Sequence, residues 1–173
     1  MKNNILILVS LLMLSLASCK TDDIDPGAAA NNELSGEWFV EYNHELAGHD
    51  PLGLGYTRLL TATTASQSAT ELIITDEDNA RNFRVKAKMD VAAGTFGSAD
   101  TLMNIIEYEG EDEEDPPFRI KVVVKNGKIV RDAVTTNAGV VADSIYFDLW
   151  LEDLGETLQV SGYRRTGFLA DEH

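Results

Sequence analysis

The chain has 173 residues and carries 29 Asp and Glu against 14 Lys and Arg, which gives a formal net charge of −15. Such an acidic surface repels nucleic acid and anionic membranes, so neither is expected as a direct partner. The length predicts one domain, and the 44% of hydrophobic residues are enough for a sizeable core. Because Cys19 is the only cysteine, no intramolecular disulfide can form, and packing must stabilise the fold.

The N-terminus has the parts of a secretory signal: a lysine, an apolar run over residues 5–16, and two small residues before a cysteine. The run has about a dozen residues, whereas a transmembrane helix needs roughly 20. The segment Leu16-Ala17-Ser18-Cys19 resembles the bacterial lipobox, which implies that residues 1–18 are removed and that Cys19 acquires a lipid. We therefore expect a protein that is anchored to a membrane and does not span it.

Residues 19–33 are acidic, small and polar, and they include Pro26 and Gly27. This composition predicts a flexible tether between the lipidated cysteine and a domain over residues 34–173. The acidic residues at 22, 23 and 25 resemble the signal that sends some lipoproteins to the outer face of the outer membrane, although a solvated linker has the same composition. The expected location is the cell envelope, as an outer-membrane lipoprotein, with periplasmic and surface display both open.

From residue 34 onward, apolar and polar residues alternate with a period of two, which is typical of strands with one buried face. The clearest example runs from Phe83 to Val91. The pattern predicts no helix and about nine strands, over residues 36–46, 56–63, 71–75, 83–91, 102–108, 118–125, 128–134, 144–152 and 157–164. Asn126-Gly127 falls between two of these runs and predicts a tight hairpin, because both turn residues need a positive φ.

Many short strands joined by brief turns predict an all-β fold, either an antiparallel barrel or a sandwich. We favour a closed up-and-down barrel of about eight or nine strands, because closure leaves no exposed edges. Gly36-Glu37-Trp38 on the first strand and Arg164 near the end resemble the lipocalin and calycin pattern. Strand parity puts Trp38 and Arg164 on the inner face, and stacking of the two side chains would close one end of the barrel.

A closer resemblance, to the bacterial family of lipid-binding putative hydrolases, covers most of the predicted domain. The matching segments are residues 36–38, 50–55, 135–136 through 142–145, and 160–168. The resemblance implies a lipocalin-like lipoprotein that binds lipid. The name of the family also implies a hydrolase activity.

A barrel of about eight strands is just wide enough to hold one small ligand or to be filled by its own side chains. The cavity is therefore predicted to bind a hydrophobic small molecule or lipid, and a dry core is the alternative. The inward positions that would contact the ligand are Tyr42, Leu60, Phe83, Val85, Met89, Ile106, Phe118, Ile120, Phe147 and Leu149.

The sequence offers little for catalysis or metal binding. No Gly-x-Ser-x-Gly motif is present. Ser144 and Asp143 could form a triad with His44 or His49, but their positions in the sequence do not show that the side chains meet. The two histidines with Asp50 form an incomplete zinc set, and the acidic run over residues 107–115 lacks the spacing of a calcium loop. We predict no catalytic residue, metal or cofactor.

The leading function is therefore a lipid-anchored binding protein. A weak lipid or ester hydrolase and a non-enzymatic surface interaction protein with a solid barrel remain the alternatives.

Overall fold

The computed structural model describes residues 31–45, 47–77, 79–110 and 115–173. The predicted signal, Cys19 and most of the predicted tether lie outside these residues. The strands are β1 (Gly36–Asn43), β2 (Thr57–Thr63), β3 (Glu71–Thr75), β4 (Arg84–Asp90), β5 (Thr95–Phe96), β6 (Leu102–Met103), β7 (Lys121–Thr135), β8 (Val141–Leu151) and β9 (Thr157–Arg164). The helical elements described are two short 3-10 turns, η2 (Asn32–Leu34) and η3 (Leu169–Asp171), and no helix in this part of the chain is long and apolar enough to cross a membrane.

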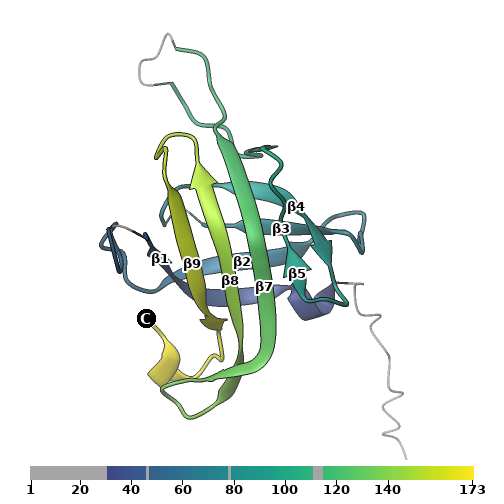
Figure 1. Ribbon diagram of the computed structural model, residues 1–173, viewed down its shortest axis with the longest axis vertical. Coiled ribbons are helices and arrows are strands. Elements are labelled where there is room, and N and C mark those ends of the chain that lie inside the picture. Colours follow the sequence, from purple (N-terminus) through teal and green to yellow (C-terminus); the bar gives the residue numbers. More distant parts are fainter. Residues whose placement is uncertain (1–30, 46, 78, 111–114) are drawn as a thin grey trace, which may run out of the picture.

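The strands form one antiparallel sheet in the order β5-β4-β3-β2-β1-β9-β8-β7-β6, and β5 also pairs with β7. This second pairing closes eight strands into a barrel and leaves β6 as an addition to the edge of β7. In Figure 1, β7, β8 and β9 run steeply in front while β2, β3 and β4 cross behind them. The prediction of an all-β, closed up-and-down barrel is confirmed.

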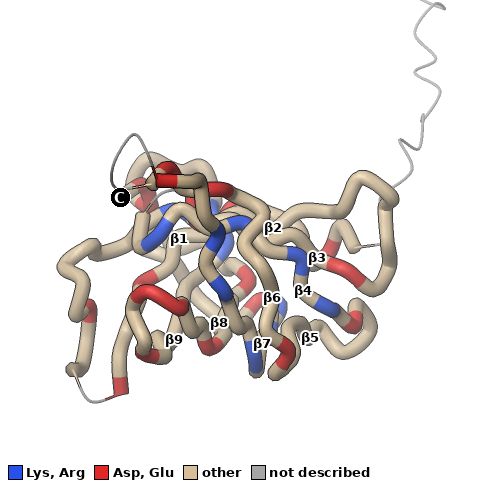
Figure 2. The backbone as a smooth tube through the Cα atoms, turned by 90° about the horizontal axis from the view of Figure 1, so that it is seen from above, with Lys and Arg blue, Asp and Glu red and all other residues tan. Residues whose placement is uncertain are grey.

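The period of two in the sequence is the direct cause of the two barrel faces. Along β4, Val85, Ala87 and Met89 are buried, whereas the charged residues between them are exposed. The interior is filled from all sides, and its largest fully buried side chains include Trp38, Tyr42, Phe83 and Phe147. Figure 2 shows that basic and acidic positions are spread over the strands and loops around the barrel.

The predicted hairpin at Asn126-Gly127 is wrong, because β7 runs through it without turning. Lys125 pairs with Asp148 and Lys128 with Tyr146, so the two residues between them form a β-bulge with one extra residue. Asn126 takes the positive φ of 57° that the dipeptide favours, but a bulge satisfies this need as well as a turn does. Gly127 pairs with Phe96 on β5. A Cβ at position 127 would come within 2.5 Å of the Phe96 carbonyl oxygen, so the absence of a side chain lets β7 approach β5 closely enough to close the barrel.

Several strand boundaries also differ from the predictions. The strand predicted over 102–108 is reduced to β6 and a single bridge between Tyr108 and Phe118. The two-residue β5 was not predicted, because it is too short to show alternation. Residues 31–33 belong to the barrel, since Asn31 is fully buried and its Nδ2 donates to the Glu71 carbonyl at 3.2 Å.

The up-and-down order places alternate connections at opposite ends of the barrel. We call the end with the loops 44–56, 76–83, 97–120 and 152–156 the loop end. The opposite end, with the loops 64–70, 91–94 and 136–140, is the plug end, where η2 enters the barrel and residues 165–173 leave it.

Candidate functional site

The plug end is closed by the pair that strand parity predicts. Trp38 pairs directly with Arg164, and the Arg164 guanidinium carbon lies 4.7 Å from the centroid of the Trp38 ring. Trp38 Nε1 donates to Thr61 Oγ1 at 2.8 Å, and Arg164 Nη1 donates to the Ser35 carbonyl at 2.8 Å. Gly36 is required beneath the guanidinium, because a Cβ there would lie 2.7 Å from Arg164 Nη1. These contacts hold the barrel end together and bury the Trp38 ring completely.

Most of the predicted cavity residues lie inside the barrel, in contact with one another. The buried ones are Tyr42, Phe83, Val85, Met89, Ile120, Phe147 and Leu149. Ile106 is only half-buried. The ring of Phe147 packs against the edge of Phe96 at a centroid distance of 5.6 Å, so side chains occupy the centre of the barrel in this conformation. Whether these residues contact a ligand stays a prediction.

Two of the cavity predictions are wrong in their orientation. Leu60 pairs with the exposed Glu37 and points outward, whereas its neighbour Leu59 pairs with Trp38 and is buried. The parity was assigned one residue out of register, and such a slip reverses every side chain of a strand. Phe118 precedes β7 and is 48% exposed, stacked on Tyr108 at 5.5 Å.

A buried polar pair lies inside the loop end and was not predicted. The Tyr42 hydroxyl donates to Asp76 Oδ1, and the other Asp76 oxygen accepts the Arg81 N–H at 2.8 Å. Both side chains are fully buried. Burial raises the pKa of Asp76 to about 6, against the opposing effect of its hydrogen bonds with Tyr42 and with backbone amides. Burial and the charge of Asp76 also raise the pKa of Tyr42 well above its usual value.

The sequence signal at Asp76 was weak, because an acidic residue after a strand is typical of an ordinary turn. Its burial depends on Tyr42, which lies 34 positions earlier in the chain. Few convergent polar groups and a shifted pKa in an apolar interior are the usual marks of a ligand site. We therefore take the loop end around Tyr42 and Asp76 as the candidate site.

Side chains from separate loops pack against the core at the loop end. Leu54, Ala80, Tyr108 and Leu154 are partly buried and pack against the core from four different connections. Asn104 is fully buried among them, and its Oδ1 accepts the N–H groups of Arg84 at 2.8 Å and Ile106 at 3.1 Å. The cover of the loop end therefore consists of loop contacts and a few hydrogen bonds, without a strand pairing across it.

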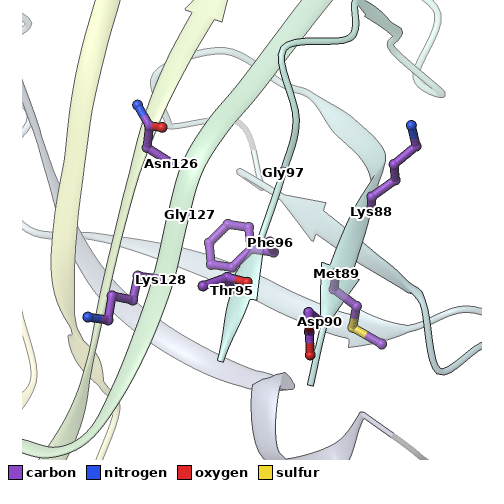
Figure 3. Close-up of a pocket in the computed structure, with 9 residues that line it drawn as sticks. All are labelled: Lys88, Met89, Asp90, Thr95, Phe96, Gly97, Asn126, Gly127 and Lys128. Carbon is purple, nitrogen blue, oxygen red and sulfur yellow. The ribbon is translucent and has the colours of Figure 1, made fainter. Parts of the chain in front are cut away.

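A second concave region lies on the outside, where β5 closes the barrel (Figure 3). It has a volume of about 520 Å³, within the range of small-molecule sites. Its lining residues are Lys88, Met89, Asp90, Thr95, Phe96, Gly97, Asn126, Gly127 and Lys128. Figure 3 shows the Lys88, Asn126 and Lys128 side chains pointing away from β5, and Lys88 pairs with Asp100 at 2.7 Å. The region is a shallow groove with mixed charge, and it contains less buried polar chemistry than the loop end.

The residues considered for hydrolysis are not brought together. Asp143 pairs with Arg164 at 3.0 Å at the plug end, and Ser144 follows it on β8. His44 follows β1 at the loop end, where it faces Glu156 at 3.6 Å, and His49 faces Glu41 at 3.4 Å. Six strand positions separate the level of Trp38 and Arg164 from that of His44, a distance of roughly 20 Å. Among the described residues, no three His, Cys, Asp or Glu side chains gather as a metal site would require.

A comparison with known protein families identifies the family of this chain. No curated protein matches the chain. The model of one protein family, described as lipid-binding putative hydrolase, matches residues 23–169, which include the whole barrel from η2 to β9. The chain belongs to the family of lipid-binding putative hydrolases.

Proposed function

We propose that this protein is an outer-membrane lipoprotein, anchored through Cys19, whose barrel binds a hydrophobic small molecule or lipid at the cell envelope. The family's description supports lipid binding in general. The observation that carries the specific proposal is the Tyr42–Asp76 pair, a buried phenol and carboxyl group beside the apolar core of the barrel.

Binding requires the loop end to open. Side chains from four loops pack against the core at this end, so they can move apart while the eight barrel strands stay paired. An apolar chain then displaces the packing around Phe83 and Phe147, and its polar end exchanges hydrogen bonds with Tyr42 and Asp76. An eight-stranded barrel is compatible with this exchange, because its interior is just wide enough to be filled by side chains or to hold one small ligand.

The test is a titration of the full chain with a naturally fluorescent polyene fatty acid. Tyr42→Phe removes the hydroxyl and keeps the ring, so we expect binding to weaken about threefold to tenfold, the effect of one lost hydrogen bond. Tyr146→Phe is the matched control, because the Tyr146 hydroxyl bonds to Asp148 on the outer face of β8. Absence of probe binding, or equal affinity of the two variants, would contradict the proposal.

A further inference from the structure

The plug end carries an exposed apolar patch made of Val141, Phe168 and Leu169. Their exposed fractions are 55%, 54% and 90%. Val141 and Phe168 line the same small pocket of about 230 Å³, and Leu169 follows Phe168 in the chain. The Ala138 N–H donates to Asp171 Oδ1 at 2.7 Å and holds the C-terminal turn against the β7–β8 hairpin, at the bottom of Figure 1. Adjacent apolar side chains this exposed are typical of interaction or membrane surfaces.

The N-terminal segment joins the barrel beside this patch. The Glu33 carbonyl accepts a hydrogen bond from Arg164 Nη2 at 2.9 Å, and Arg164 lines the pocket below Phe168. About a dozen residues connect this point with Cys19, which limits their reach to roughly 40 Å. A lipid on Cys19 therefore keeps the plug end within reach of the bilayer.

The connecting loops at the two ends of the barrel differ sharply in charge, although the segments that enter and leave at the plug end include Glu33, Asp171 and Glu172. The plug-end loops 64–70, 91–94 and 136–140 contain no charged residue. The loop-end connections 44–56, 76–83, 97–120 and 152–156 each contain two or more acidic residues. Of the arginines beside the patch, Arg164 pairs with Asp143, and Arg165 pairs with Glu37 and Glu172. The plug end can thus approach lipid head groups with little electrostatic repulsion, whereas the loop end is repelled by anionic lipid.

We propose that the plug end faces the phospholipid bilayer and that Phe168 and Leu169 enter its interfacial region. This orientation rests on the proposed anchor at Cys19. A lipid anchor and an apolar contact reinforce each other, since each adds apolar surface that is buried in the membrane. The loop end, with Tyr42 and Asp76 beneath it, then points away from the membrane and receives its ligand from the aqueous side.

A rival apolar group lies at the loop end and makes the orientation testable. Met103, Ile105 and Phe118 are about half-exposed there. Exposed acidic residues flank them, including Glu107, Glu109 and Asp115. These acidic residues disfavour contact between the loop-end apolar group and anionic lipid head groups. The N-terminal segment enters the barrel at the plug end, not at the loop end.

The experiment uses the acylated full chain in phosphatidylcholine vesicles with brominated acyl chains, which quench tryptophan on contact. Leu169→Trp reports on the plug end, and Phe118→Trp is the matched variant at the loop end. Both sites are exposed, so neither substitution disturbs the core. After subtraction of the parent signal from Trp38 and Trp150, we expect about a twofold or greater loss of emission from the residue at position 169, and little loss at position 118.

Flotation of each variant with the vesicles separates the two hypotheses. Flotation without quenching at position 169, or with quenching at position 118 alone, overturns the orientation and leaves the anchor intact. Failure of the acylated chain to float overturns the anchor, and the orientation with it, but leaves ligand binding by the barrel unaffected.

Discussion

The two ends of the barrel are closed in different ways. At the plug end, Trp38 and Arg164 are direct neighbours on paired strands, so their contact is part of the sheet itself. At the loop end, side chains from loops pack against the core, and the Tyr42–Asp76 pair contains a buried carboxyl group. The comparison teaches that one end is held by stacking and hydrogen bonds between paired strands, whereas we expect the stability of the other to vary with the protonation of Asp76.

The largest expected effect is at the plug end. Trp38→Ala removes a fully buried indole, and we expect the free energy of unfolding to fall by about 3–5 kcal/mol. Leu54→Ala, at the half-buried cover of the loop end, is the comparison and should cost roughly a third as much. Urea unfolding followed by circular dichroism measures both. Equal losses in the free energy of unfolding would show that the two ends contribute equally to stability.

The next effect is the pH dependence of the loop end. The pKa of Asp76 is about 6 in the folded protein, against an ordinary value of 3.8. Because the folded state holds the proton more tightly, the stability that Asp76 contributes is fully present below its ordinary pKa and is lost as the pH rises through about 6. The loss amounts to about 3 kcal/mol.

The measurement is the difference in unfolding free energy between the parent and Asp76→Asn from pH 4 to pH 7. The parent should lose stability relative to the variant as the pH rises. Asp50→Asn is the control of opposite sign, because backbone hydrogen bonds from Gly55 and Leu54 lower the pKa of Asp50. The stability from Asp50 is therefore lost only as the pH falls below its ordinary pKa of 3.8, so this control is also followed from pH 4 down to about pH 2. Parallel curves for the parent and Asp76→Asn would mean that Asp76 does not titrate near pH 6.

The smallest effect concerns the geometry of the plug. Arg164→Lys keeps the charge but loses the planar guanidinium that lies over Trp38 and bonds to the Ser35 and Glu33 carbonyls. We expect a loss of about 1–2 kcal/mol. A double-mutant cycle with Trp38→Leu should show coupling between the two residues, and additive losses would mean that the stacking contributes no stability.

Local pattern was sufficient for much of the fold. Strands β3 and β9 begin and end where alternation predicts, because their apolar residues repeat with period two and turn residues flank them. The same parity places Trp38 and Arg164 on one face. Strand parity gave the wrong orientation for Leu60, because Leu59 and Leu60 are both apolar. Only the pairing with β1 decides which of them is buried.

The candidate site was less predictable than the fold. The inward aromatic residues follow from alternation, but Asp76 looks like any acidic turn residue until Tyr42 comes to lie beside it. Asn104 is similar, since its burial depends on Asn82 and Arg84 from a loop and strand about 20 positions earlier.

The sequence by itself determined an all-β protein with an apolar inner face and a tryptophan and arginine at one end, and it predicts a lipid anchor at Cys19. Only the tertiary structure decided that Asn126-Gly127 is a bulge, which of two leucines faces inward, and where a buried acid lies. The physical reason is that alternation acts over neighbouring residues, whereas register, closure and burial depend on strands that are distant in the chain.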